Sequence, residues 1–474
     1  MPSEHIRMML DRRAFLRAAG ATAAGGAAWL AGAGLDGPLG AVVEAVRPAG
    51  VTRYPLRIPT EVSPSALTLR AAPSVVSLGA KTSNAWTYNG LLPGPTIRAQ
   101  SGDSAMIALV NGLTEETITH WHGMLVDDLN DGHPRFAIPP GGTYKYQFVI
   151  NQRACLNWYH PHPHMLTGKQ VNLGLAGAFV VNDAEELAIG LPSGAYEVPL
   201  IVRDATTDKN GNLVYKPAAG GFDGKFPLVN GIKDPYLDVG TTLYRLRILN
   251  GSNARIYRLA LSNGAAAGVL FWLIGNDGGL LESPVPLASI DIAPAERIDV
   301  LVDFSQINLG TSVMLRDLRA AWDLLEFRVV NAVSVSGGIP STLSTITRLA
   351  INDVQTTRDF SFDGMSRING QEYDLTRIDF TVPFDQTELW RFTTNGNAPH
   401  PVHVHGASFQ VWKRTGGRGD VFPWERGWKD TVLLEDGETV EILIRFQAHR
   451  GIYLLHCHKL EHEDMGMMAN FKVV

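Results

Sequence analysis

The sequence predicts an all-β protein built from three consecutive Greek-key β-sandwich domains. Its 474 residues are too many for one hydrophobic core, and the usual domain size gives about three domains. It contains 48 Gly and 27 Pro, a composition that favours turns and short strands over long helices. Alternation of apolar and polar residues, the pattern of a half-buried strand, recurs along the whole chain.

Four segments show this alternation most clearly. They are YKYQFVI at 144–150, TTLYRLRILN at 241–250, RIDVLVDF at 297–304 and TVEILIRF at 439–446. Gly, Pro, Asn or Asp bound each segment, as expected for the strands of a Greek-key sandwich.

The first 35 residues are predicted to be an export signal rather than part of the fold. Arg12 and Arg13 precede Phe15, and an Ala/Gly-rich run then leads to a plausible cleavage site near Ala33. This arrangement resembles a twin-arginine signal, an address that the Tat translocase reads. The apolar run is shorter and weaker than a membrane span of about 20 residues requires. We therefore expect export to the periplasm or the extracellular space, without a stable membrane anchor.

The rest of the chain is expected to divide near residues 185 and 350. An Asn-Gly pair followed by an extended stretch recurs at 86–99, 228–239 and 367–380. This weak sequence repeat indicates three similar domains, and no low-complexity insertion interrupts them. The predicted domains are 45–185, 186–350 and 351–474.

The net charge argues against nucleic-acid binding, and the cysteine content limits the possible disulfides to one. The formal charge is −6, and residues 1–33 carry four Arg against two acidic residues, so their removal leaves −8. A mildly acidic chain is a poor nucleic-acid binder. Cys155 and Cys457 are the only cysteines, and they could pair in an oxidising compartment. If Cys457 binds a metal, no disulfide is possible, and Cys155 is then expected to be a small buried residue.

The histidines are concentrated in four short segments. Of 14 histidines, eleven lie in HWHG (120–123), HPHPH (160–164), HPVHVHG (400–406) and HCHKLEH (456–462), and none lies between 165 and 399. Each segment contains His-x-His, and on a strand residues i and i+2 point to the same face. A single such pair is weak evidence, whereas four pairs predict a buried cluster of metal ligands.

The HCH segment at 456–458 indicates two different metal sites. If the two histidines face one side of a strand, Cys457 faces the other. Cys457, His462 and Met467, with one more His, would form a Cys-His-His set with a weak axial Met, the ligand type of a blue-copper centre. Structural zinc sites usually take two or more Cys and rarely use Met, so copper fits better than zinc.

The four histidine segments, in this order, resemble the four copper signatures of the three-domain multicopper oxidases, and the chain is similar to a bacterial laccase. The resemblance implies cupredoxin-like domains, a central domain without copper ligands, and four copper ions per chain. It implies a type 1 copper held by His400, Cys457, His462 and axial Met467. It also implies a trinuclear site in which His120 and His403 bind the type 2 copper, while His122, His160, His162, His405, His456 and His458 bind the type 3 pair.

Three carboxylates match acidic positions of related oxidases. Asp131 and Glu463 match proton donors near the trinuclear site, and carboxylates are suitable proton carriers. Without such a role, Asp131 would be a turn residue before Gly132 and Glu463 part of a solvated acidic loop. Asp430 matches a position near the type 1 site, where it would orient a ligand His.

Other His and Met residues are expected to lie outside the ligand set. We interpret His133 and His449 as surface or loop residues, and His164 at most as a neighbour of a ligand. Met465 and Met468 are expected to pack rather than to bind metal.

The resemblance implies one-electron oxidation of phenols or amines coupled to four-electron reduction of O2 to water. The main alternative is a metallo-oxidase that oxidises cuprous ions in copper tolerance. The chain has 11 Met, lacks a Met-rich insertion, and has Gly-Asn-Ala-Pro before His400, features that favour organic substrates. A copper-free scaffold, as in exported cell-division proteins of this fold, is disfavoured by the complete ligand set. A copper nitrite reductase is disfavoured by the paired histidines of HCH.

Overall fold

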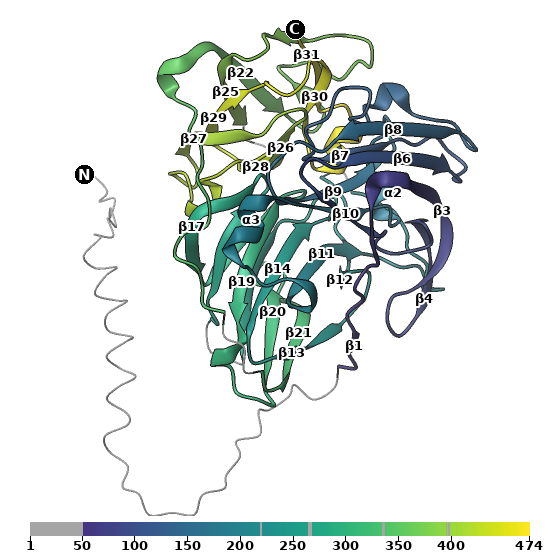
Figure 1. The fold of residues 1–474 in the computed structure, drawn as a ribbon. Helices are drawn as coiled ribbons and strands as arrows, with labels where there is room; N and C mark the ends of the chain where they lie inside the picture. The colour runs from purple at the N-terminus through teal and green to yellow at the C-terminus, as the bar shows by residue number, and fades with distance from the viewer. Residues whose placement is uncertain (1–50, 219, 264–267, 334–336, 395, 397–398) are drawn as a thin grey trace, which may run out of the picture. The chain divides into compact units, whose positions relative to one another are not determined.

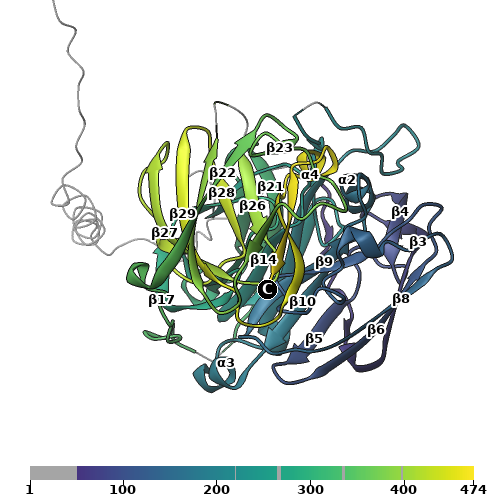
Figure 2. The same ribbon diagram turned by 90° about the horizontal axis from the view of Figure 1, so that it is seen from above.

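The computed structural model describes residues 51–474 apart from 219, 264–267, 334–336, 395 and 397–398. The predicted export signal and the predicted domain start at residue 45 lie outside the described residues. Nearly all regular structure is β, in six sheets that form three successive groups along the chain. In Figures 1 and 2 these groups follow the colour bar, purple and blue, then teal, then green to yellow. The predicted all-β sandwich class is confirmed.

The first group holds a four-stranded sheet, β4-β3-β6-β8, and a five-stranded sheet, β2-β5-β10-β9-β7. In β8 the side chains of Tyr146 and Phe148 point into the core while their neighbours are more exposed, which is the alternation seen in the sequence. The strands are β2 (Glu61–Val62), β3 (Leu67–Ser77), β4 (Thr82–Tyr88), β5 (Thr96–Gln100), β6 (Ser104–Asn111), β7 (Thr119–His122), β8 (Thr143–Val149), β9 (Cys155–Pro161) and β10 (Gly177–Asn182).

The central group holds two six-stranded sheets, β1-β13-β21-β20-β15-β18 and β12-β11-β14-β19-β16-β17. Leu, Ile and Val side chains of both sheets form its core. The strands are β1 (Tyr54–Pro55), β11 (Glu197–Ala205), β12 (Phe226–Val229), β13 (Pro235–Gly240), β14 (Leu243–Asn250), β15 (Tyr257–Ser262), β16 (Phe271–Asn276), β17 (Gly279–Leu287), β18 (Ser289–Ile292), β19 (Arg297–Asp303), β20 (Ser312–Asp317) and β21 (Trp322–Asn331).

The third group holds two five-stranded sheets, β23-β22-β25-β29-β27 and β24-β31-β30-β26-β28. Its aromatic core includes Trp390 and Phe471, and it also contains Cys457 and Met467. The strands are β22 (Val354–Asp363), β23 (Arg367–Ile368), β24 (Phe380–Val382), β25 (Thr387–Thr394), β26 (His400–Val404), β27 (Phe409–Gly416), β28 (Thr431–Leu434), β29 (Glu438–Arg445), β30 (Gly451–Cys457) and β31 (Met468–Val473).

Helices are short and lie between strands. In the described part of the chain, no helix has the length and apolar character needed to cross a membrane. The α-helices are α2 (Thr167–Asn172), α3 (Ala184–Ile189) and α4 (Leu460–Asp464), and the 3-10 helices are η1 (Pro64–Ala66), η2 (Pro134–Phe136), η3 (Gly194–Tyr196), η4 (Phe304–Gln306), η5 (Ile351–Asp353) and η6 (Pro423–Glu425).

The three Asn-Gly pairs form the same tight turn. In each pair, at 89–90, 230–231 and 369–370, both residues have positive φ, between 48° and 75°. This conformation is that of a type I′ turn, which Asn-Gly adopts most readily. The repeated sequence feature is therefore a repeated structural element, one turn for each group of strands.

The grouping of strands supports the predicted domain boundaries, which we keep as a proposal. β10 ends at Asn182 and β11 begins at Glu197, while β21 ends at Asn331 and β22 begins at Val354. The short β1 precedes the first group in sequence but pairs with β13 of the central group.

Candidate metal centre

Paired strands carry the four histidine segments. β7 and β9 are antiparallel, and His120 lies directly opposite His160. β26 and β30 are also antiparallel, and His403 lies directly opposite His456. Because alternate residues of a strand share a face, each register brings further histidines to the same side.

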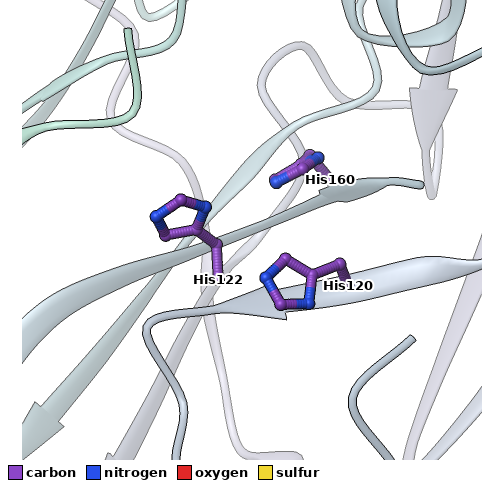
Figure 3. A group of neighbouring side chains, drawn as sticks. All are labelled: His120, His122 and His160. Atoms are coloured by element: carbon purple, nitrogen blue, oxygen red, sulfur yellow. The ribbon is translucent and has the colours of Figure 1, made fainter. Parts of the chain in front are cut away.

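Eight imidazoles from these strands and from the residues just after their ends form one buried cluster. Rings of the first and third groups meet face to face: the His122 and His403 centroids are 3.7 Å apart, and those of His120 and His405 are 3.9 Å apart. Figure 3 shows the rings of His120 and His122 with that of His160 of the neighbouring strand. The eight residues, each at most 1% exposed, are His120, His122, His160, His162, His403, His405, His456 and His458.

The cluster leaves ring nitrogens without a protein partner. Nε2 of His120, His160 and His403 is buried and unpaired, while Nδ1 of each ring contacts a backbone oxygen. Nδ1 of His122 and both nitrogens of His458 are also unpaired. Buried polar atoms normally have partners, so several unpaired ring nitrogens in one cluster fit bound metal ions.

A second group lies on the other side of β30. His400 Nδ1 is 3.4 Å and His462 Nδ1 is 3.7 Å from Cys457 Sγ, and the two Nδ1 atoms are 3.2 Å apart. Met467 is fully buried and accepts a backbone hydrogen bond from Cys457 N–H. Cys457 faces away from the eight imidazoles, as the HCH alternation predicts, and it lies with His400, His462 and Met467, the set that the family resemblance implies.

The chemistry of this second group also fits a metal. Cys457 is a free thiol, and burial raises its pKa to about 12. A thiol in such surroundings ionises only if a cation offsets the cost of burying the charge. Its neighbours are neutral, because burial lowers the pKa of His400 to about 3 and of His462 to about 2.

Asp131 and Glu463 both border the eight-histidine cluster and are 1% exposed. Asp131 Oδ2 accepts a hydrogen bond of 2.8 Å from His405 Nδ1. Glu463 Oε1 lies 3.4 Å from His162 Nδ1, and its Oε2 lies 3.3 Å from His456 Nδ1. Burial raises the pKa of both carboxyl groups well above its ordinary value. Both residues touch the cluster, so neither belongs to a solvated loop.

Asp430 does not lie where the sequence analysis placed it. It was expected beside His400, Cys457 and His462, but its Oδ1 lies 3.0 Å from Nε2 of His122, a member of the eight-histidine cluster. The neighbouring Thr431, which the sequence analysis missed, places its hydroxyl 3.2 Å from both His122 Nε2 and His403 Nδ1. β28 begins at Thr431 and pairs with β26, which turns this segment toward the cluster.

Residues outside the predicted ligand set differ in burial. His133 lies in a loop, which was one of its two expected settings, but it is fully buried and its Nε2 contacts Asn470 Oδ1, so the surface interpretation is wrong. Met468 is buried, as expected for a packing residue. Met465 is 41% exposed, so the expectation that it packs in the interior is wrong. The His164 ring lies 5.2 Å from the Tyr373 ring, centroid to centroid, and is tilted against it rather than joining the cluster. Cys155 is buried, as expected, and its sulfur contacts the side chains of Gln152 and Asn157.

Comparison with known sequences decides the family. Two sequence profiles described as multicopper oxidase match residues 71–186 and 341–474. The chain is 37% identical over 397 residues to multicopper oxidase mco of Staphylococcus haemolyticus, covering 82% of this chain and 84% of that protein. The chain belongs to the multicopper oxidase family. Membership implies a copper-dependent oxidoreductase with O2 as acceptor, and the two buried groups fit the copper sites of this family.

Relatives with other names also resemble the chain. It is 31% identical to the laccase of Bacillus subtilis over 460 residues, which cover 81% of this chain and 89% of the laccase. It is 32% identical to cell division protein FtsP of Dickeya dadantii over 489 residues, covering 98% of both chains.

Solved structures agree with this assignment. McoA multicopper oxidase of Aquifex aeolicus superposes with a TM-score of 0.83 at 35% identity, covering 89% of this chain and all of McoA. A multicopper oxidase of Campylobacter jejuni described as a metallo-oxidase superposes with a TM-score of 0.75 at 28% identity, covering 88% of this chain and 96% of that one.

Buried neutral imidazoles make the stability of the fold sensitive to acid. Burial lowers the pKa of His160 and of His133 to about 4, and that of His403 to about 3, whereas an unfolded His has a pKa of about 6.5. Below that value the unfolded chain binds more protons than the folded chain, so stability falls with pH.

We expect the free energy of unfolding of the copper-free protein to fall between about pH 7 and about pH 5, by up to about 1.4 kcal/mol per pH unit for each such imidazole. The midpoint of urea unfolding should therefore move to lower urea concentration. A midpoint that stays constant over this range would contradict the burial of neutral histidines.

Proposed function

We propose that the protein is a laccase-like multicopper oxidase that couples one-electron oxidation of phenols or amines to reduction of O2 to water. One observation carries the proposal: two buried ligand groups, one of eight imidazoles and one with a thiol, are joined by the continuous segment His456-Cys457-His458. A protein without redox function would have no need for this connection.

The proposed ligands are those that the family signatures imply. The type 1 copper would be held by His400, Cys457, His462 and Met467. His120 and His403 would hold the type 2 copper, and the type 3 pair would be held by His122, His160, His162, His405, His456 and His458. Ligand atoms of His400, Cys457 and His462 lie close together, and so do those of several histidine triplets in the cluster, which supports two metal-binding groups.

Bound copper would supply one-electron redox chemistry, with the thiolate and the weak thioether raising the potential of the type 1 site. The chain supplies the connection, because Cys457 is covalently bonded to both His456 and His458. It also excludes water, since the thiol and both imidazoles are fully buried. The buried segment His456-Cys457-His458 would therefore connect the two copper sites through covalent bonds.

Asp131 and Glu463 are the proposed proton donors for water formation. Both carboxyl groups are buried beside imidazoles that would be occupied with copper and unable to move protons freely. Their raised pKa values favour the protonated form, which can donate.

The choice between organic substrates and metal ions rests on composition. The chain has 11 methionines in 474 residues, without a Met-rich insertion, which favours organic substrates over cuprous ions. Both kinds of relative exist, the laccase of Bacillus subtilis and the metallo-oxidase of Campylobacter jejuni. The test compares kcat/KM of copper-loaded protein for a phenol such as 2,6-dimethoxyphenol and for Cu(I). A higher value for Cu(I) would reverse the proposal.

A copper-free role is the second candidate, because the FtsP relative is described as a cell division protein. The unpaired buried nitrogens of the cluster favour a metal-loaded protein instead. Metal analysis of purified protein separates the two. About four copper ions per chain would support the oxidase, and a folded protein that takes up no copper would support the scaffold.

Copper is also expected to stabilise the fold. Ligands from the first and third groups of strands converge on one cluster, and binding energy that requires the folded state adds to folding energy. We expect a higher Tm for copper-loaded than for copper-free protein in a calorimetric scan. Equal values at saturating copper would contradict a site that both groups share.

Export is proposed from residues 1–35, in particular Arg12 and Arg13 followed by Phe15. We expect that replacing both arginines with lysine leaves the precursor in the cytoplasm. If export does not depend on the Tat translocase, the variant would still be exported.

A further inference from the structure

A buried arginine of the central group connects all three groups of strands behind the histidine cluster. Arg297, the first residue of β19, is fully buried. Its Nε donates to Leu156 O of β9 at 2.9 Å, and its Nη2 donates to Asp277 O at 3.1 Å. Its Nη1 and Nη2 donate to Asp430 Oδ1 and Oδ2 at 2.7 and 2.5 Å. This two-bond contact fixes the plane of the Asp430 carboxylate as well as its position.

The fixed carboxylate determines how one histidine faces the cluster. Asp430 Oδ1 lies 3.0 Å from His122 Nε2, so the ring proton resides on Nε2 and Nδ1 keeps its lone pair. Four other rings are held the opposite way: Nδ1 of His120, His160, His403 and His405 contacts an oxygen, which leaves Nε2 toward the cluster. His122 is thus held through Nε2 by the carboxylate of Asp430, whereas the His403 ring contacts the backbone oxygen of the same residue through Nδ1.

The chain leaves space for this arrangement at Gly123. A side chain there would place its Cβ 2.6 Å from Arg297 Nη2 and 2.9 Å from Asp430 Oδ2, and the φ of Gly123 is +89°. Both conditions require glycine. The glycine of HWHG therefore allows the ion pair to lie directly behind His122.

We propose that Arg297 is a positioning residue for the trinuclear site, supplied by the central domain that provides no copper ligand. It holds Asp430 so that the carboxylate keeps the His122 proton on Nε2 and directs Nδ1 to the metal. The inference rests on the proposed ligand set, in which His122 binds the type 3 pair.

A purely structural role is the competing explanation, and Arg247 provides its control. Arg247 is also fully buried, and it pairs with Glu186, Glu197 and Asp299 between the first and central groups. In the described part of the chain, these three carboxylates pair with arginines and none of them forms an ion pair with a histidine ring. Replacing Arg247 is thus expected to lower the stability of the fold by removing buried ion pairs, without disturbing a proposed copper ligand.

The experiment compares Arg297→Met, Arg297→Lys and Arg247→Met with the wild-type holoenzyme. We measure copper per chain, the blue absorption of the type 1 site, and the paramagnetic resonance and near-ultraviolet signals of the trinuclear site. Arg297→Met is expected to keep the blue absorption and to weaken copper retention at the trinuclear site by about 10- to 100-fold. Arg297→Lys is expected to be intermediate, because lysine keeps the charge but not the two-bond geometry. Arg247→Met is expected to lower Tm with all copper signals unchanged.

A double variant addresses misfolding. Arg297→Met combined with Asp430→Asn removes the uncompensated buried charge, so the fold and blue absorption are expected to be retained while the trinuclear signals stay altered. Wild-type trinuclear signals in Arg297→Met or in the double variant would overturn the inference. A wild-type protein that binds no copper would instead refute the proposed function, so the two failures are distinguishable.

Discussion

Cys457→Ser is expected to abolish both the blue colour and the oxidation of laccase substrates. The sulfur lies within 3.7 Å of the Nδ1 atoms of His400 and His462, and a serine hydroxyl cannot replace a soft thiolate as a copper ligand. The variant removes the site that accepts electrons from substrate, so turnover should fall to the background rate. Absorption spectra and O2 uptake with a phenol measure the two effects.

Cys155→Ser is the matched control, since the chain has only these two cysteines. Cys155 is buried like Cys457, but its sulfur contacts amide side chains and no imidazole. We expect a modest loss of stability and an unchanged spectrum. A blue, active Cys457→Ser protein would refute the ligand assignment.

Asp131→Asn and Glu463→Gln are expected to lower kcat for O2 reduction by about 10²- to 10⁴-fold each, the range typical of a lost proton donor. An amide keeps the shape of the carboxyl group but supplies no acidic proton. Both side chains are buried and lie against rings of the cluster, so bulk water cannot easily substitute for them. Stopped-flow reoxidation of the reduced enzyme by O2 measures the affected step.

Asp464→Asn is the control for Glu463→Gln. Asp464 is adjacent in sequence, but its carboxylate accepts backbone hydrogen bonds from Thr167 and Gly168 at the start of α2 instead of facing the cluster. Figure 2 shows α4 beside α2, where this contact is made. We expect lower stability and unchanged kcat for the control. Wild-type reoxidation rates in both cluster variants would remove these residues from the mechanism.

The sequence was sufficient to predict the fold class and to predict that histidines and one cysteine form the candidate metal sites. Period-two alternation and turn residues depend only on local geometry, so the all-β class could be predicted from them. The i, i+2 spacing of His456 and His458 likewise required Cys457 to face away from both. The three Asn-Gly turns were visible as weak repeats before their common conformation was known.

The sequence misled where contacts join distant segments. Asp430 was assigned to the wrong site, and His133 was not expected to be buried. The residues next to them in the sequence do not indicate that Asp430 contacts His122 or that His133 contacts Asn470. Arg297 was seen only as part of a strand pattern. Its bond to Asp430 spans 133 positions, and a strand register does not predict which domains meet behind it.

Residue type and spacing by themselves thus determined that this chain gathers two kinds of metal ligand on opposite faces of one strand. Only the tertiary structure decided which ring nitrogen contacts a carboxylate or carbonyl oxygen in His120, His122, His160, His403 and His405. The reason is that a ring's orientation is set by its hydrogen-bond partner, and for His405 and His122 that partner lies 274 and 308 residues away.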